Sequence, residues 1–114
     1  MAETVLMVDD EAGLRRLVRT MLEMGGYTIL EAEDGLAALE QLQATTPDLI
    51  ILDVMMPNMD GITFCQTVRQ EPQWQKLPIM MLSGKTQQWA VEEGLAAGAN
   101  EYLSKPIALG ALLE

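Results

Sequence analysis

Short apolar runs recur along the chain, and each is followed by polar residues. The runs cover residues 5–8, 49–52, 79–82 and 102–103. Runs of four apolar residues are typical of strands covered on both faces, as in parallel sheets. The polar residues after the runs are Asp9 and Asp10, Asp53, Ser83, and Lys105 with Pro106. Because the carboxyl ends of parallel strands share one edge of a sheet, the pattern predicts a polar site at that edge.

Segments with helical spacing separate these runs. The apolar positions of the first segment follow the spacing i, i+3, i+4, i+7 and i+8 and are Leu14, Leu17, Val18, Met21 and Leu22. Gly25 and Gly26 end this helix, and residues 27–31 form the next predicted strand. Thr28 and Glu31 make that strand partly polar, so we expect it at an edge of the sheet.

The alternation continues to the end of the chain. The second helix is predicted to begin with a cap at Asp34, and its apolar positions are Leu36, Leu39 and Leu42. A third helix is expected over residues 61–70, and a fourth carries Val91 and Leu95 and ends near Gly98. Five strands that alternate with helices predict an α/β fold, with a parallel sheet between two helical layers.

Composition narrows the class of protein. The 114 residues fit one domain, and the net charge of −10 argues against direct nucleic-acid binding. No apolar run approaches the ~20 residues that cross a bilayer, so we expect no membrane partner. The single Cys65 cannot form an internal disulfide, which favours a cytoplasmic location.

The last part of the chain is short for a helix. Eight residues follow Pro106, and Leu109, Leu112 and Leu113 resemble a core-facing stripe that is cut short. We therefore expect one domain over residues 1–114, with a truncated last helix that leaves room for an output domain after residue 114.

The acids at the predicted edge favour a metal. Two like charges ~4 Å apart repel by roughly 4 kcal/mol at an effective dielectric near 20. A divalent cation with oxygen ligands relieves that repulsion, and Mg²⁺ is the first candidate, with Mn²⁺ as an alternative. Another interpretation is that Asp10 caps the first helix while Asp9 faces solvent. Asp53 is either a turn former or a nucleophile, since carboxylates form aspartyl phosphates.

Four stretches together resemble a known family. They are residues 8–11 (VDDE), 53–61 (DVMMPNMDG), 81–84 (MLSG) and 97–106 (AGANEYLSKP). In this order and spacing the chain resembles a response-regulator receiver domain of two-component signalling, over essentially all of its residues. The resemblance implies a flavodoxin-like (βα)5 fold, as in chemotaxis regulators, with strand order 2-1-3-4-5.

The resemblance implies separate roles for the acids and for the loop after Asp53. Asp53 matches the residue that accepts the phosphoryl group. Asp10 resembles a direct magnesium ligand, and Asp9 one that acts mainly through water. The main-chain carbonyl of Met55 matches a further ligand, and Met55 and Lys85 occupy positions that tune the lifetime of the phosphoryl group.

Further roles concern phosphate contacts and the switch. Ser83, Gly84 and Lys105 match the hydroxyl, backbone and ammonium that contact the phosphoryl group, and a cis bond before Pro106 would aim Lys105 inward. Tyr102 matches the aromatic residue that turns into the space that Ser83 vacates. A static, half-buried Tyr102 is the alternative.

The function implied is a phospho-accepting switch. Histidine is absent from the chain, so a phosphohistidine donor must belong to a partner, either a sensor histidine kinase or a histidine phosphotransfer protein. Phosphorylation would change the surface of the fourth helix and fifth strand to control an output domain or protein. The chain would be a regulator rather than a turnover enzyme, although it would support its own phosphorylation and slow autodephosphorylation.

Other functions with this fold are weighed against that one. A pseudo-receiver that binds proteins without phosphorylation is the main alternative, and the intact set of site residues argues against it. An aspartate-nucleophile phosphatase would need a second acid two residues beyond Asp53. A flavin-binding protein would need a phosphate-binding Gly-rich loop after the first strand, and none is present.

Some surface positions invite a second interpretation. Arg15, Arg16 and Arg19 lie on the first helix, which contributes to kinase docking in receivers, or they form a solvated face. Trp89 is either an exposed partner contact or a packed residue, and the spacing of Cys65 predicts a core position. Dimerisation through the fourth helix, fifth strand and last helix is a family mode that we carry over as an expectation.

Overall fold

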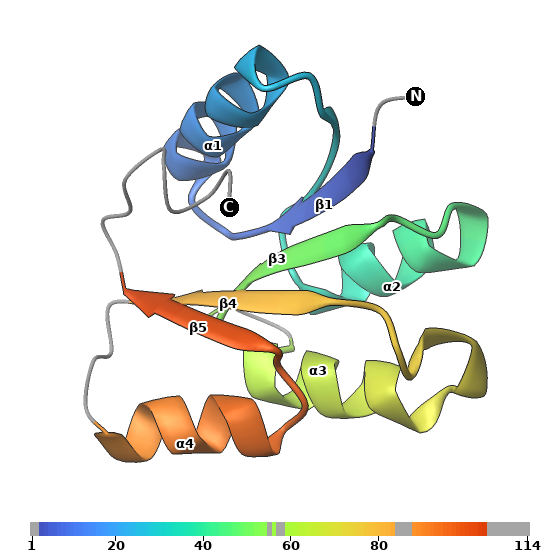
Figure 1. Ribbon diagram of the computed structural model, residues 1–114, viewed down its shortest axis with the longest axis vertical. Coiled ribbons are helices and arrows are strands. Elements are labelled where there is room, and N and C mark those ends of the chain that lie inside the picture. The colour runs from blue at the N-terminus through green and yellow to red at the C-terminus, as the bar shows by residue number, and fades with distance from the viewer. Residues whose placement is uncertain (1–2, 55, 57–58, 84–87, 105–114) are drawn as a thin grey trace.

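A single parallel sheet organises the structure, a computed structural model that describes residues 3–54, 56, 59–83 and 88–104 (Figure 1). The elements in chain order are β1 (Thr4–Val8), α1 (Ala12–Met24), β2 (Thr28–Ala32), α2 (Gly35–Ala44), β3 (Leu49–Asp53), α3 (Gly61–Gln70), the 3₁₀ helix η1 (Pro72–Trp74), β4 (Ile79–Ser83), α4 (Gln88–Ala96) and β5 (Glu101–Ser104). The strand order is β2-β1-β3-β4-β5, and neighbouring strands are parallel. The predicted flavodoxin-like fold, the strand order and the edge position of β2 are confirmed, whereas η1 was not predicted.

Helices cover both faces of the sheet. Figure 1 shows α1 on one face and α2, α3 and α4 on the other. Alternate residues of β1 serve the two layers: Val5 and Met7 pack with Val18 of α1, whereas Leu6 and Val8 belong to the opposite core. This arrangement explains why the central strands are apolar at every position. Among the residues that the structure describes, no helix is long and apolar enough to cross a membrane.

The predicted apolar face of α1 is only partly correct. Val18 and Leu22 are buried, but Leu17 is 56% exposed. Each helical residue turns the chain by about 100°, so Leu17 lies about 100° from Val18 and about 140° from Leu22. The buried stripe is centred on Val18 and Leu22, and Leu17 lies outside it.

Helix α4 differs from its prediction more strongly. Its buried residues are Ala90 and Gly94, whereas Leu95 is exposed. A Cβ atom added to Gly94 would lie 2.8 Å from Met81 Sδ and 2.8 Å from Tyr102 Cδ2. The helix thus approaches the sheet through small residues, which a search for large apolar side chains does not find. Leu36 of α2 is exposed for a related reason, since Ala38 and Leu42 face the core instead.

The helix starts show which acids are caps. Asp34 caps α2, since its Oδ1 accepts a hydrogen bond from Ala37 N at 2.8 Å, as predicted. Asp60 caps α3 through Thr63 N at 2.8 Å, a role that was not predicted. The residue at the N-cap of α1 is Glu11. The interpretation of Asp10 as the cap of that helix is therefore wrong.

Two residues with ambiguous or core predictions are now placed. Cys65 is fully buried, as its spacing predicted, and burial raises the pKa of its thiol. Trp89 is 57% exposed on α4, so it is a surface residue and not part of the core. The predicted last helix, with Leu109, Leu112 and Leu113, lies outside the described residues.

Candidate metal and phosphoryl site

The end of β1 carries one buried and one exposed acid. Asp9 has no exposed surface, whereas Asp10 is exposed. The backbone N–H of Asp9 donates to Ala32 O of β2 at 3.1 Å, and Asp9 Oδ1 accepts from Glu11 N at 2.9 Å. The interpretation of Asp9 as a solvated acid is therefore wrong. The chain turn after β1 holds this carboxylate in place, while Asp10 stays exposed to solvent.

The adjacent strand ends carry Asp53 and Ser83. Asp53 is the last residue of β3 and pairs with Leu82, the residue before Ser83 in β4. Asp53 is 5% exposed and Ser83 is 1% exposed, so both polar groups lie within the sheet edge. The sheet register thus brings the predicted acceptor next to the predicted phosphate-binding hydroxyl.

Gly61 allows the start of α3 to approach Asp53. A Cβ atom added there would collide with the Asp53 carbonyl oxygen and lie 2.8 Å from Val54 Cα. Gly61 N donates to Val54 O at 2.8 Å, which fixes this approach. The sequence predicted the start of the third helix at Gly61 but gave no reason for a glycine there. The requirement for glycine at this place becomes visible once α3 and β3 are seen together.

Three carboxylates converge at this edge. One oxygen each from Asp9, Asp10 and Asp53 lies within 4.8 Å of the others. Like charges this close are costly unless a cation or proton is shared between them. Carboxylate oxygens are hard ligands, and Mg²⁺ typically takes one or two of them together with water and phosphate oxygens. The donor set therefore fits Mg²⁺, and two of its members are buried as an ordered site requires.

Part of the predicted site is not described by the structure. Met55, Gly84, Lys85, Lys105 and Pro106 lie outside the described residues. Their predicted roles as carbonyl ligand, phosphate contact, rate-tuning residue, counter-charge and cis-proline stay predictions.

Tyr102, the predicted switch residue, lies on β5. It pairs with Met81 of β4, two residues before Ser83, and is half-buried against the core beneath α4. The Gly94 contact described above places the edge of its ring against α4. The structure is one state of the protein, so the predicted rotation of Tyr102 stays a prediction.

An ion-pair network borders the acidic cluster. Arg15 and Arg19 of α1 both bind Glu31 of β2, with N–O distances of 3.3 and 2.7 Å. The hydrogen bond from Arg19 has the largest effect and lowers the pKa of the Glu31 carboxyl. Burial opposes it to a smaller extent, and the hydrogen bond from Arg15 lowers the pKa further by a still smaller amount. Two of the three arginines of α1 are therefore paired with a carboxylate. Neither the docking interpretation nor the solvated-face interpretation anticipated this pairing.

Comparisons with known proteins agree with this geometry. Residues 5–114 match the family model described as response regulator receiver domain. The alkaline phosphatase synthesis transcriptional regulatory protein PhoP of Bacillus subtilis is 43% identical over 108 residues, covering 93% of this chain and 43% of PhoP. The response regulator MprA of Mycobacterium ulcerans is 41% identical over 113 residues, covering 99% of this chain and 48% of MprA. The chain thus spans about half the length of these curated relatives.

Solved structures give the same answer. The chemotaxis protein CheY4 of Vibrio cholerae superposes with a TM-score of 0.93 at 39% identity, covering 99% of this chain and 94% of CheY4. The receiver domain of the Francisella response regulator 1452 superposes with a TM-score of 0.90 at 32% identity, covering 97% and 90% of the two chains. The chain therefore belongs to the family of response regulator receiver domains.

Proposed function

We propose that this domain is a phospho-accepting signalling switch in which Asp53 takes a phosphoryl group from a partner's phosphohistidine in the presence of Mg²⁺. The observation that carries the proposal is the convergence of Asp9, Asp10 and Asp53 within 4.8 Å. Ser83 on the neighbouring strand end and membership in the receiver family support it. The donor is a sensor histidine kinase or a histidine phosphotransfer protein.

The chemistry is a phosphoryl transfer between two nucleophiles. A carboxylate oxygen of Asp53 attacks phosphorus and forms the new O–P bond. The P–N bond to the partner's imidazole breaks, and its electron pair stays on the ring nitrogen. Ser83 donates its hydroxyl hydrogen to a phosphoryl oxygen, and Gly84 N and the Lys105 ammonium contact the same group.

The acids hold the cofactor and set its position. Asp10 would bind the cation directly, Asp9 would act mainly through water, and Asp53 and the Met55 carbonyl would complete the protein ligands. Mn²⁺ can replace Mg²⁺ because it accepts the same oxygen ligands. When bound, the cation neutralises charge on the transferring phosphoryl group.

Phosphorylation is read at the surface of α4 and β5. Ser83 moves toward the phosphoryl group, Tyr102 turns inward beneath α4, and the exposed Trp89 changes its surroundings. Hydrolysis of the acyl phosphate then resets the switch at a rate that Met55 and Lys85 tune. The domain therefore acts as a regulator rather than as a turnover enzyme.

The setting of the switch belongs to the same proposal. We place a receiver domain over residues 1–114 in the cytoplasm, without direct nucleic-acid or membrane contact of its own. The name of PhoP, a transcriptional regulatory protein, supports an output domain after residue 114 as the reader of the switch. Dimerisation through α4, β5 and the segment after Pro106 is the proposed mode of self-association.

Intact mass tests the proposal. The protein is incubated with Mg²⁺ and a small phosphodonor such as acetyl phosphate, and it should gain one phosphoryl group. Asp53→Asn should gain none. Asp48→Asn is the matched control, because Asp48 is an exposed acid that binds Thr4 N at 2.7 Å near the opposite edge of the sheet. A gain that survives Asp53→Asn contradicts the assignment, and no gain by the wild type favours a pseudo-receiver.

A further inference from the structure

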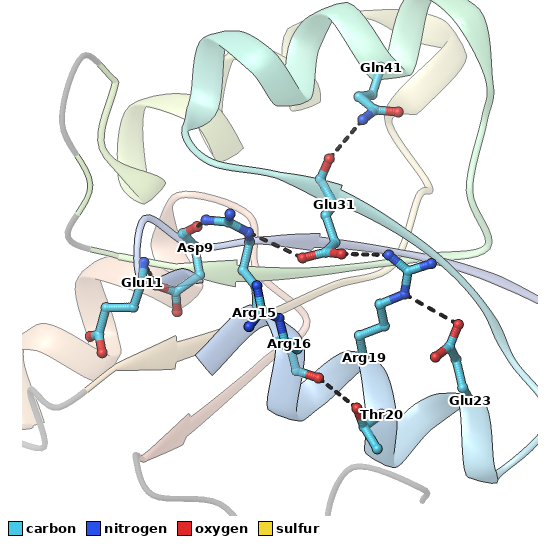
Figure 2. Close-up of polar contacts among 9 residues, drawn as sticks. All are labelled: Asp9, Glu11, Arg15, Arg16, Arg19, Thr20, Glu23, Glu31 and Gln41. Atoms are coloured by element: carbon cyan, nitrogen blue, oxygen red, sulfur yellow. Dashed lines mark hydrogen bonds and ion pairs between the residues drawn. The ribbon is translucent and has the colours of Figure 1, made fainter. Parts of the chain in front are cut away.

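The side chain of Arg15 links the acidic cluster to the edge strand of the sheet. Figure 2 shows its guanidinium between the end of β1 and Glu31 of β2. Nη1 donates to the main-chain oxygen of Asp9 at 2.6 Å, and Nε donates to Glu31 Oε1 at 3.3 Å. Arg15 is 17% exposed, compared with 45% for Arg19. The guanidinium is therefore partly buried, and it is held by Glu31 and by the main chain of Asp9.

The oxygen that Arg15 binds belongs to the peptide unit between Asp9 and Asp10. A peptide unit is planar, so holding this oxygen restricts rotation of the plane that joins the two acids and limits how they lie relative to each other. The N–H of Asp9 is held from the other side by Ala32 O, and Asp9 Oδ1 is held by Glu11 N. Arg15 thus completes a set of bonds that orients the first two acids of the cluster.

The contacts of Arg15 explain how a positively charged side chain can lie next to a site for a divalent cation. An arginine that paired with the site carboxylates would compete with a divalent ion for them. Arg15 instead contacts Asp9 through a neutral carbonyl, and its hydrogen-bonded carboxylate is Glu31. Glu31 is anchored in turn by Arg19 at 2.7 Å, and its main-chain oxygen accepts from Gln41 of α2 at 2.7 Å.

We infer that Arg15, held by Glu31, is a positioning residue for the metal site: it fixes the Asp9–Asp10 peptide so that both carboxylates can bind one cation. This inference rests on the proposed function, since it assumes that the cluster binds Mg²⁺. Residues that orient metal ligands commonly change metal affinity by about tenfold or more when they are replaced.

Calorimetric titration of chelator-treated protein with Mg²⁺ tests the inference without any phosphoryl transfer. Arg15→Gln should raise the Kd for Mg²⁺ at least about fivefold. Arg19→Gln is the matched control, because Arg19 binds the same Glu31 carboxylate, whereas the bond to the Asp9 main-chain oxygen comes from Arg15. The Kd of Arg19→Gln should stay within about twofold of the wild type. The amide NMR signals of Asp9 and Asp10 should shift in Arg15→Gln and not in Arg19→Gln.

The outcomes distinguish a failure of the proposed function from a failure of the positioning role of Arg15. A wild type that binds no Mg²⁺ contradicts the proposed function together with this inference. Normal wild-type binding with an unchanged Kd in Arg15→Gln, or an equal rise in Arg19→Gln, contradicts the positioning role alone. If Arg15→Gln does not fold, Glu31→Gln carries the test: a Kd raised at least about threefold supports the inference, and an unchanged Kd overturns it.

Discussion

The two edges of the sheet use charged side chains in different ways. At the carboxyl edge, Asp9, Asp10 and Asp53 bring like charges within 4.8 Å of one another. At the amino edge, one cation, Arg69 of α3, meets neutral acceptors. It donates to the carbonyls of Gly98, Trp74, Gln75 and Leu77 and to Asn100 Oδ1 at 2.7 to 3.2 Å.

The contacts of Arg69 gather three segments at the start of β4. Asn100 Oδ1 also accepts from Ile79 N at 2.9 Å, and Asn100 N donates to Ile79 O at 2.8 Å. The α3 end, the η1–β4 connection and the α4–β5 turn are thus tied together. Each of these contacts favours folding, whereas the acids opposite repel one another, and a bound cation would relieve that repulsion. Under the proposed function, the amino edge serves stability and the carboxyl edge serves cation and phosphoryl binding.

Replacing Arg69 should give the largest loss of stability. Arg69→Ala removes several charge-assisted hydrogen bonds and leaves partly buried carbonyls unpaired, so the free energy of unfolding should fall by about 2–3 kcal/mol. Urea unfolding measures this loss. Arg16→Ala, at an exposed position of α1, should change it by less than about 0.5 kcal/mol. Equal effects of the two variants would remove the contrast between the edges.

A pair of glycine substitutions sharpens the same contrast. Gly98 has φ +119°, and an added Cβ would lie 2.6 Å from Arg69 Cγ, so Gly98→Ala should cost about 1–2 kcal/mol. Gly13 in α1 has open space around an added Cβ, so Gly13→Ala should stabilise the protein by about 0.5 kcal/mol. Thermal unfolding of both variants checks the opposite signs. A neutral Gly98→Ala would contradict the close packing at the amino edge.

Removing one acid should stabilise the metal-free protein. Asp10→Asn relieves repulsion from Asp9 and Asp53, which should raise the free energy of unfolding by about 1 kcal/mol without Mg²⁺. The same change should reduce the stabilisation that added Mg²⁺ gives. Melting temperatures with Mg²⁺ and with chelator measure both effects. An unchanged response to Mg²⁺ would count against Asp10 as a ligand.

The smallest expected effect is the pH dependence that comes from Glu31. Its pKa is lowered in the folded protein, chiefly by the Arg19 hydrogen bond, from an ordinary value near 4.5. The contribution of this carboxylate is therefore complete above that value and is lost as the pH falls through the folded pKa. Since the Arg19–Glu31 ion pair is partly exposed, we expect the Glu31 carboxylate to contribute a few tenths of a kcal/mol to the free energy of unfolding at pH 7.

Glu31→Gln isolates that contribution. The difference in unfolding free energy between the wild type and Glu31→Gln should shrink as the pH falls from 6 to 3. A difference that grows toward low pH would have the wrong sign for a carboxylate held by arginines.

The apolar runs predicted a parallel sheet with Asp9, Asp53 and Ser83 at one edge, whereas the strand order came from the family resemblance. This succeeded because the strands are buried on both faces, so their sequence signal is strong. The faces of α1 and α4 were harder to predict. Leu17 and Leu95 are exposed because small residues and the centre of each stripe, not the largest side chains, determine how a helix approaches the sheet.

The supporting contacts of the site could not be predicted from local pattern. Arg15 meets Asp9 and Glu31 only because α1 packs beside β2, and no spacing along the chain shows this. The need for glycine at position 61 likewise depends on how closely α3 approaches the backbone of Asp53. Such contacts join segments whose distance in space the sequence does not give.

The most direct test of the carboxyl-edge site is the dependence of phosphorylation on Mg²⁺. Wild-type protein is incubated with acetyl phosphate in two matched samples, one with Mg²⁺ and one with excess chelator, and the intact mass of each is recorded. The account predicts one added phosphoryl group with Mg²⁺ and almost none with chelator. Equal gains in the two samples, or none in either, would contradict it.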